Sequence, residues 1–589
     1  MRRLLVGFFT AIGFLSFLFV IAVVVLITRL QPSAPALPGK IILSLDLTRG
    51  LAEGAGEEGL QRLIFGTQPS LRDIVDALEA AQADPRVKGV LARVGSDDTG
   101  FAKAQQVRDE ITAFRAKGKF AIAFADSFGE FGAGTRPYYL ATAFDQIWLQ
   151  PMGSLGLTGL YAEAMFIRDT LNKLGIAPEF GHKGQFKTAA NVLTETQMTP
   201  PQREEVEDLL KSISGQVVNG IAQARKLSPE AVTAAIDKAP LLPNEALETK
   251  LIDRLGYRDD AIIEAHRRAS GAELVGVSAY LDGAGRPHRT GERIALIYGS
   301  GLIVRGGGPS NPLTQSDLMA ANAITTAFRD AVRDPKVRAI LFRIDSPGGS
   351  VVASETIWHD VVYARERGKP VIVSMGDVAG SGGYYVAAPA DKIVAEPATL
   401  TGSIGVLAGK LVIADLLKKI GVSTDAAQFG VNAGMFSATS NFSPLAHARL
   451  QAFLDASYKG FKEHVAAGRH MSADAVEAVA QGRVWTGEEA KVKGLVDALG
   501  GYGVALRLAK EVANIPADSP VELTVFPRQQ GIVAYLYERL TGTQHDDDNS
   551  AGANALGRAF EAAQPLVAQA AAALDNSNIL LMSPLTQPR

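Results

Sequence analysis

The amino-acid sequence predicts an α/β protein built from two tandem copies of one domain and attached to a membrane by an N-terminal transmembrane helix. Three observations support this class. The 589-residue chain repeats itself at a spacing of about 250 residues, each repeat alternates helical patterns with short apolar runs, and an uncharged apolar stretch stands at the N-terminus. A chain of this length has room for two to four domains with substantial cores.

The internal repeat is visible in matched segments of the two halves. Residues 84–91 (DPRVKGVL) reappear as residues 334–341 (DPKVRAIL), and residues 251–256 (LIDRLG) match residues 495–500 (LVDALG). The offset between matched segments drifts only from 250 to 244 residues, which indicates a tandem duplication. We therefore divide the chain into an anchor with its linker, a first repeat, a second repeat, and an acidic, Ala-rich tail, at residues 1–38, 39–280, 281–540 and 541–589.

Helical and extended patterns alternate within each repeat. In the second repeat, residues 320–332 predict a helix, residues 339–344 a buried strand, residues 354–366 a helix and residues 371–375 a strand. Strands that alternate with helices of this length are typical of crossover units in a mostly parallel sheet with both faces covered. Each repeat is therefore expected to be an α/β domain.

The N-terminal stretch predicts a membrane anchor. Residues 4–28 carry no charge, and about 20 such apolar residues suffice to span a bilayer as a helix. Arg2 and Arg3 precede the stretch, which favours a cytoplasmic N-terminus and an exported body. A cleavable signal peptide is the alternative, because residues 34–36 read Ala-Pro-Ala, but the stretch is longer than a typical signal core. We expect a single-pass protein of the inner (cytoplasmic) membrane with its body on the periplasmic or extracytoplasmic side.

Composition excludes several classes of function. The net charge is -3 and the sequence has no dense stripe of Lys and Arg, so no nucleic-acid partner is expected. Cysteine is absent, which excludes disulfides, thiolate nucleophiles and Cys-bound zinc. His464 and His470 lack any zinc-ligand spacing. Residues 181–188 resemble a phosphate-binding loop, but Phe186 stands where that loop needs glycine. We expect neither a metal site nor a nucleotide site.

Two glycine-rich segments of the second repeat have the composition of a nucleophile turn and an oxyanion hole. Residues 379–385 (AGSGGYY) follow a predicted strand and precede an apparent helix, where the Ser381 hydroxyl would stand beside free backbone N–H groups. Residues 345–350 (DSPGGS) directly follow the preceding strand. Ligands gather at the carboxyl ends of parallel strands, so we expect both turns at the same edge of the sheet.

These two segments and residues 399–405 (TLTGSIG) occur in the order, and with the gaps, of a known peptidase family. The sequence closely resembles the signal peptide peptidase A family, also called protease IV, in its long duplicated form, over nearly the whole chain. The resemblance implies ClpP/crotonase-like domains and a serine peptidase with a Ser–Lys dyad. It places the nucleophile at Ser381, the general base at Lys187, and the hydrogen-bond partner of the lysine at Ser403.

The same resemblance implies the remaining features of the site. The oxyanion donors would be the backbone N–H of Gly382 and one from Gly348 or Gly349. The implied substrates are remnant signal peptides in the bilayer and other extended, apolar peptides, which a tether at residues 4–28 would keep close to the enzyme. The family also implies a homotetramer and no cofactor.

Comparison of the two repeats supports a divided site. Thr135 aligns with Ser381, but the two following glycines are replaced by Arg136 and Pro137, and proline has no N–H to donate. Conversely, Lys187 aligns with Ser437, so the second repeat has no lysine at that place. One repeat keeps the serine and the other keeps the base. A single site between the repeats explains this division.

A lysine base must be neutral, although its ordinary pKa is near 10.4. Burial lowers the pKa of a lysine by up to several units, and the apolar neighbours of Lys187 permit such burial. Lys183, one helical turn earlier, is the rival base. A Ser-His-Asp triad is disfavoured because His359 is expected on the exposed face of a helix.

Two other classes of function remain open at this point. The ClpP/crotonase fold also carries acyl-CoA chemistry, in which paired backbone N–H groups hold a thioester oxyanion without a serine nucleophile. The bilayer anchor and the divided Ser/Lys pattern count against that class. A non-catalytic membrane scaffold is the other alternative, but it predicts eroded glycines in both repeats, and only one set is eroded.

Overall fold

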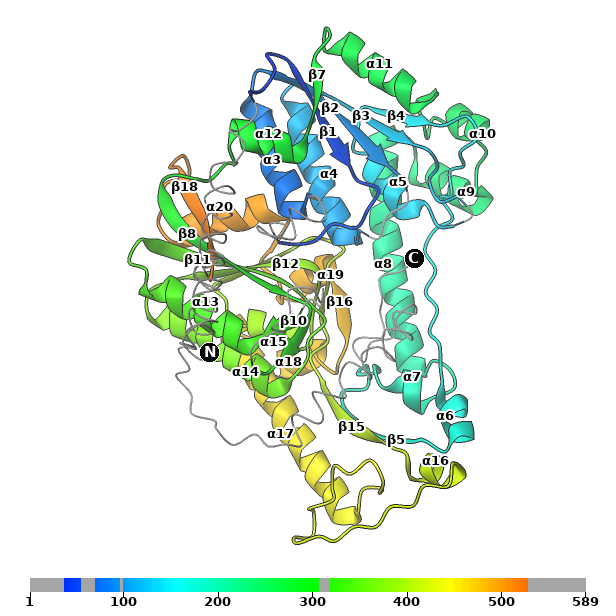
Figure 1. Ribbon diagram of the computed structural model, residues 1–589, viewed down its shortest axis with the longest axis vertical. Coiled ribbons are helices and arrows are strands. Elements are labelled where there is room, and N and C mark those ends of the chain that lie inside the picture. The colour runs from blue at the N-terminus through cyan, green and yellow to red at the C-terminus, as the bar shows by residue number, and fades with distance from the viewer. Residues whose placement is uncertain (1–35, 55–68, 96–98, 131, 307–317, 528–589) are drawn as a thin grey trace, which may run out of the picture.

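Two predominantly parallel sheets, one in each repeat, form the two halves of the molecule (Figure 1). This computed structural model describes residues 36–54, 69–95, 99–130, 132–306 and 318–527. The predicted span at residues 4–28 and the tail at 541–589 lie outside the described residues. Of the predicted anchor and linker, only residues 36–38 are described. Within the described part of the chain, no helix is both long and apolar enough to cross a bilayer.

The sheet of the first repeat is parallel throughout. Its strands follow the order β6 (Arg254–Leu255), β4 (Gln146–Leu149), β3 (Phe120–Ala125), β2 (Val87–Val94), β1 (Ile41–Asp46) and β7 (Glu273–Gly276). The central strands are almost fully buried, as expected for strands covered by helices on both faces.

The sheet of the second repeat repeats this order and adds two strands near the candidate site. The matching strands are β17 (Ala498–Leu499), β13 (Lys392–Ala395), β12 (Val371–Gly380), β11 (Val337–Ser346), β8 (Glu292–Ser300) and β18 (Val521–Phe526). The additional β14 (Leu400–Gly402) pairs with β12, and β16 (Val484–Thr486) runs antiparallel to β14. The equal strand order confirms the α/β class and the duplication.

Helices fill the layers around the sheets (Figure 1). Between the sheets lie α3 (Leu71–Ala83), α4 (Phe101–Ala116), α12 (Val277–Ala284) and α20 (Tyr502–Val512), which share one apolar core with both sheets. α11 (Arg258–Arg268) covers the outer face of the first sheet. The outer face of the second sheet is covered by α13 (Ala321–Arg333), α14 (Val351–Glu366) and α15 (Gly382–Ala387). The two repeats are therefore packed on a common core.

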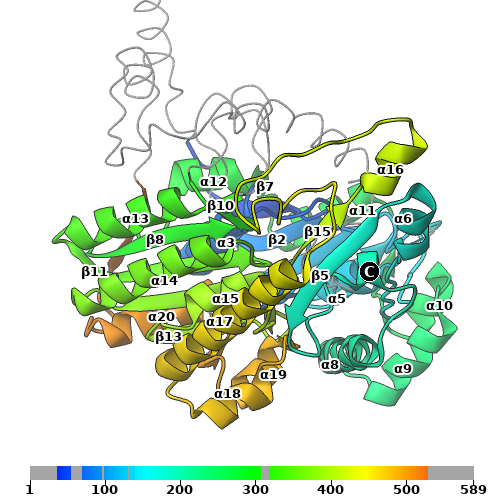
Figure 2. The ribbon, with the colours of Figure 1, turned by 90° about the horizontal axis from the view of Figure 1, so that it is seen from below.

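Two long helices and a two-stranded arm extend from these layers (Figures 1 and 2). The helices are α8 (Pro200–Arg225) of the first repeat and α17 (Pro444–Arg469) of the second. The arm pairs β5 (Ala177–Lys183) of the first repeat antiparallel with β15 (Val406–Val412) of the second. The remaining elements are α5 (Thr135–Ala141), α6 (Arg168–Leu174), α7 (Asn191–Thr194), α9 (Pro229–Lys238), α10 (Pro243–Glu248), β9 (Leu302–Val304), β10 (Leu318–Ala320), α16 (Ala414–Lys419), α18 (Ala473–Val479) and α19 (Gly487–Val492).

Most predicted elements of the second repeat agree with the structure to within a few residues, and two details differ. The strand predicted at residues 371–375 continues to Gly380, because its later residues pair with β14. The domain boundary predicted between residues 280 and 281 falls inside α12, which packs against α3 of the first repeat. The boundary between the repeats stays a prediction, and α12 is the element that spans it.

Candidate active site

Ser381 stands at the junction between β12 and α15. Its backbone adopts φ 54° and ψ −116°, a conformation that costs energy for a residue with a side chain and is typical of nucleophile turns. The Ser381 N–H donates to the Gly402 carbonyl at 2.9 Å, which fixes the turn to β14. The strand-to-helix turn expected from the sequence is present.

Lys187 reaches this serine from the other repeat. It lies in the segment between β5 and α7 of the first repeat, and its Nζ is 2.9 Å from Ser381 Oγ. The same Nζ lies 2.9 Å from Ser403 Oγ and 3.1 Å from the Ser403 carbonyl. The structure thus brings together the three side chains singled out in the sequence. Because an ammonium has three N–H donors, these three oxygens can hold it in one orientation.

Burial sets the protonation of this lysine. Lys187 is 6% exposed, and desolvation lowers its pKa to about 8, while the charge of Glu205 acts in the opposite direction. A lysine with this pKa is neutral far more often near pH 7 than a lysine in water. The site therefore contains an amine that can accept a proton from Ser381.

Ser403 is buried, and hydrogen bonds fix its position beside the lysine. It follows β14 with φ 51°, and it is 3% exposed. Its N–H donates to the Arg483 carbonyl at 2.8 Å, which ties it to the residue before β16. Its hydroxyl and carbonyl both face the lysine amine, so one residue supplies two of the three acceptors.

The second glycine-rich turn lies against the nucleophile turn, as expected from the strand order. Ser346, at the end of β11, pairs with Ala379 of β12. The Gly348 N–H donates to Ser346 Oγ at 3.2 Å, whereas no described residue accepts a hydrogen bond from the N–H of Gly349 or Gly382. A Cβ placed on Gly382 would lie 3.1 Å from the Gly349 nitrogen, so these two N–H groups are close neighbours. Gly349 is therefore a better second donor than Gly348.

A cavity of about 340 Å3 opens in front of the serine. Its lining includes Ser381, Gly382, Gly349 and Lys187. The rest of the lining is mostly apolar and includes Leu302, Ile303, Val351, Val406, Leu407 and Phe461. A peptide placed here would meet the hydroxyl, the amine and the free N–H groups at once.

The other residues weighed in the sequence lie away from these atoms. Lys183 is paired with Asp455 at 2.7 Å. Thr135 is buried, and its hydroxyl donates to the Gly159 carbonyl at 2.9 Å. His359 is exposed on α14. His464 contacts Glu355 at 3.1 Å and stacks on Trp358. The structure brings none of them to Ser381.

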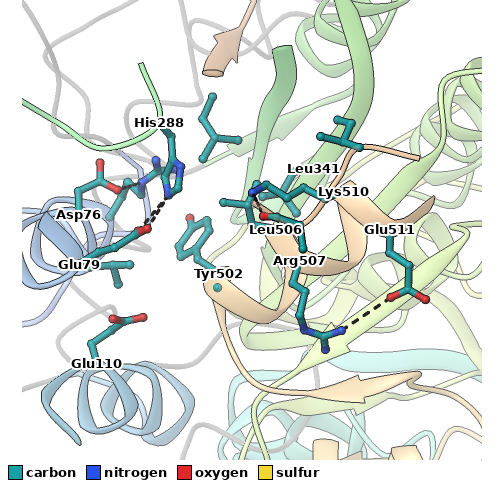
Figure 3. A pocket seen from close by; sticks show the side chains of 16 residues that line it. Asp76, Glu79, Glu110, His288, Leu341, Tyr502, Leu506, Arg507, Lys510 and Glu511 are labelled. Atoms are coloured by element: carbon teal, nitrogen blue, oxygen red, sulfur yellow. Dashed lines mark hydrogen bonds and ion pairs between the residues drawn. The ribbon is translucent and has the colours of Figure 1, made fainter. Parts of the chain in front are cut away.

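A larger cavity of about 660 Å3 lies between the repeats and shares no lining residue with the first (Figure 3). Its walls carry Asp76 and Glu79 of α3, Glu110 of α4 and Tyr502 of α20. His288 and Glu79 pair with each other at 2.9 Å across it. Its lining includes no serine, threonine or cysteine, so it does not compete with the Ser381 site for peptide chemistry.

Sequence reasoning missed one acidic residue beside the lysine. Glu205 of α8 is 1% exposed, and burial raises its pKa to about 8. In the sequence it stands within residues 203–208 (REEVED), where five of six residues are charged, a composition typical of an exposed helix face. Only the packing of α8 on β16 shows that this member of the run points inward.

Comparison with known proteins agrees with the geometry. The model of peptidase family S49 matches residues 113–271 and 363–516, one segment in each repeat. The chloroplastic serine protease SPPA of Arabidopsis thaliana is 32% identical over 79% of this chain and 69% of its own length. Protease 4 of Salmonella typhi is 32% identical over 77% of this chain and 75% of its own length. Protease 4 of Haemophilus influenzae is 29% identical over 86% of this chain and 85% of its own length.

The prediction of a serine peptidase of the signal peptide peptidase A type is confirmed. None of these relatives is named as an acyl-CoA enzyme or as a non-catalytic scaffold. Because the family model covers more than half of the chain and matches both repeats, this protein belongs to peptidase family S49 and is a serine peptidase.

Proposed function

We propose that the protein is an endopeptidase with a Ser–Lys dyad, in which Ser381 is the nucleophile and Lys187 the general base. The observation that carries this proposal is the 2.9 Å separation between Lys187 Nζ and Ser381 Oγ, contributed by different repeats. The low exposure of the lysine supports the proposal, because a base must be free of its proton near neutral pH. Ser403 orients the amine through its hydroxyl and carbonyl.

The proposed reaction has two stages. Ser381 Oγ attacks the scissile carbonyl carbon while its proton passes to Lys187, and the developing oxyanion accepts hydrogen bonds from the N–H groups of Gly349 and Gly382. The intermediate collapses to an acyl-enzyme as the leaving amine takes the proton from Lys187. Water then attacks the ester, gives a proton to Lys187, and releases the new carboxyl end as Ser381 regains its hydrogen.

The proposed substrates are remnant signal peptides and other extended, apolar peptides. The apolar lining of the cavity beside Ser381 supports this class, since apolar side chains gain about 25 cal/mol for each Å2 removed from water. A membrane helix at residues 4–28 would hold the enzyme beside such substrates in the inner membrane, with the body outside the cytoplasm. We further propose ClpP/crotonase-type domains, the division at 1–38, 39–280, 281–540 and 541–589, and a homotetramer.

A fluorophosphonate probe, which reacts with activated serines, tests the nucleophile. We expect the wild-type protein to be labelled at Ser381 and the Ser381→Ala variant to remain unlabelled. Thr135→Ala, which changes the matching residue of the first repeat, is the control and should label normally. Labelling of Ser381→Ala at full level, or a folded wild-type protein that hydrolyses peptides without being labelled at Ser381, would contradict the assignment.

A further inference from the structure

The lysine amine has a buried acidic neighbour that the reaction proposed above does not use. Glu205 projects from α8, and its Oε1 accepts the N–H of Val484 at 2.6 Å. Its second oxygen, Oε2, is buried and has no hydrogen-bond partner among the described residues. Glu205 therefore joins a helix of the first repeat to the start of β16 in the second.

The segment that Glu205 holds is packed directly on Lys187. The Phe186 N–H donates to the Gln481 carbonyl at 2.8 Å. Gly482 follows with φ 80°, and a Cβ at this position would lie 2.5 Å from the Lys187 nitrogen and 2.7 Å from the Lys187 Cβ. The chain at residues 481–484 thus forms a wall against the backbone of the lysine, with no room for a side chain at Gly482.

The same segment also fixes Ser403. The Ser403 N–H donates to the Arg483 carbonyl at 2.8 Å, and the Gly482 N–H donates to the Ile404 carbonyl at 2.8 Å. Val484 itself pairs with Gly402, the residue before Ser403. A displacement of residues 481–484 would therefore move both the lysine and the serine that orients its amine.

Stability alone gives no reason for a carboxyl group at this place. Burial of a carboxyl with one oxygen unpaired carries a desolvation cost that an apolar side chain of similar size would avoid. The cost is visible in the raised pKa of Glu205, about 8. The hydrogen bond from Val484 opposes this increase in part, as do the charges of Lys187 and Arg483, whereas Glu204 adds to it. A carboxyl kept here despite its cost is best explained by its effect on the site.

We propose that Glu205 is a positioning residue for the general base: by accepting the Val484 N–H it holds residues 481–484 against Lys187 and Ser403. This inference rests on the proposed role of Lys187. Because its pKa is about 8, the Glu205 carboxyl is mostly protonated near neutral pH, and it acts there as a hydrogen-bond acceptor and not as a charge.

The test compares Glu205→Ala and Glu205→Gln in peptide hydrolysis by the full chain. Glu205→Ala removes the acceptor of the Val484 N–H, so we expect kcat to fall about 10²-fold with little change in KM, as for a small misplacement of a catalytic group. Glu205→Gln keeps an oxygen acceptor for the Val484 N–H, so we expect its kcat to be near the wild-type value.

Glu204→Ala is the matched control. Glu204 is the preceding residue of the same helix and binds Arg483 of the same segment at 2.8 Å, but its side chain is 57% exposed. It should leave kcat unchanged. Wild-type kcat in Glu205→Ala, or an equal loss of kcat in folded Glu205→Ala and Glu205→Gln, would overturn the proposal.

If Glu205→Ala fails to fold, Glu205→Leu takes its place, because leucine fills a similar volume without an acceptor, and wild-type kcat in that variant would equally overturn the proposal. The Lys187→Ala variant distinguishes failure of the Glu205 proposal from failure of the Ser–Lys dyad. Activity that persists in Lys187→Ala removes the general base on which the inference rests. An inactive Lys187→Ala beside an unaffected Glu205→Ala removes the positioning role alone.

Discussion

At the scale of single residues, the proposed chemistry depends on an amine that is kept out of water. Lys187 has a pKa of about 8 because it is buried, and three oxygens of Ser381 and Ser403 surround its Nζ. Lys183 has the same side chain four residues earlier, but it is partly exposed and paired with Asp455. The difference between a base and an ordinary lysine thus lies in the surroundings and not in the residue type.

Replacement of Lys187 by alanine is expected to lower kcat/KM for peptide hydrolysis by about 10⁴-fold or more, because the residues of a nucleophile–base unit act together. The same variant should fold normally, since removal of a buried amine leaves no unpaired charge. Steady-state hydrolysis of an apolar peptide and a thermal melt measure the two effects. Lys183→Ala is the control and should retain nearly full activity. Loss of activity in Lys183→Ala with retention in Lys187→Ala would reverse the assignment.

The proximity of Ser381, Lys187 and Ser403 could be predicted from the sequence, because each stands in a short motif and the two repeats keep complementary halves of the pair. It could not choose between Gly348 and Gly349. That choice depends on which N–H is already bonded, and the Gly348 N–H is taken by Ser346 Oγ. Nothing in the sequence indicated that Glu205 is buried beside Lys187, since a glutamate in a mostly charged helical stretch is ordinarily solvated.

At the scale of elements, the nucleophile depends on how β12 and β11 end. β12 runs to the residue before Ser381, and the turn after β11 lies against it through Gly348 and Gly349. Sequence patterns placed both strands correctly but ended β12 at residue 375. The later part of β12 pairs with β14, and a pairing between residues far apart in the chain is invisible to local patterns.

Substitution of Gly349 by alanine tests the oxyanion turn. Gly349 has φ 154°, and a Cβ there would lie 2.2 Å from the Ile303 carbonyl oxygen, so the turn must shift. We expect kcat to fall about 10²- to 10³-fold, the usual effect of losing one oxyanion donor. Steady-state hydrolysis at saturating peptide measures this loss.

Gly368→Ala is the control for that experiment. Gly368 also has a positive φ of 73°, but no atom lies within 4 Å of a Cβ placed there. Its substitution strains the backbone without touching the site, so stability should fall while kcat is retained. An equal loss of kcat in both variants would show that the effect of Gly349→Ala is one of folding and not of oxyanion binding.

At the scale of the whole molecule, the proposed active site requires the two repeats to remain in register. A buried ion pair joins them beneath the oxyanion turn: Arg343 of β11 is 1% exposed and binds both oxygens of Glu53, at 2.8 and 3.0 Å. Lys103 of α4 adds a second link, at 2.9 Å to Asp345. The duplication was evident from the sequence, but these links were not, because they join residues more than 200 positions apart.

Glu53→Ala is therefore expected to destabilise the protein by about 3–5 kcal/mol, because it leaves the Arg343 guanidinium buried without its counter-charge. The midpoint of urea unfolding, measured with a probe in each repeat, reports the loss. Arg203→Ala is the control, since its pair with Glu207 is exposed on both sides and 4.0 Å apart, and should cost less than about 1 kcal/mol. Equal midpoints for Glu53→Ala and the wild type would show that this pair does not join the repeats.

The most direct test of the divided dyad is the pH dependence of fluorophosphonate reaction at Ser381. Serine is activated only when Lys187 is neutral, so the rate for the wild type should rise with pH through a midpoint near the lysine pKa of about 8. In Lys187→Ala the rate should be low and should lack this inflection. An inflection that persists at the same pH in Lys187→Ala would show that another group activates the serine, and it would contradict a dyad divided between the two repeats.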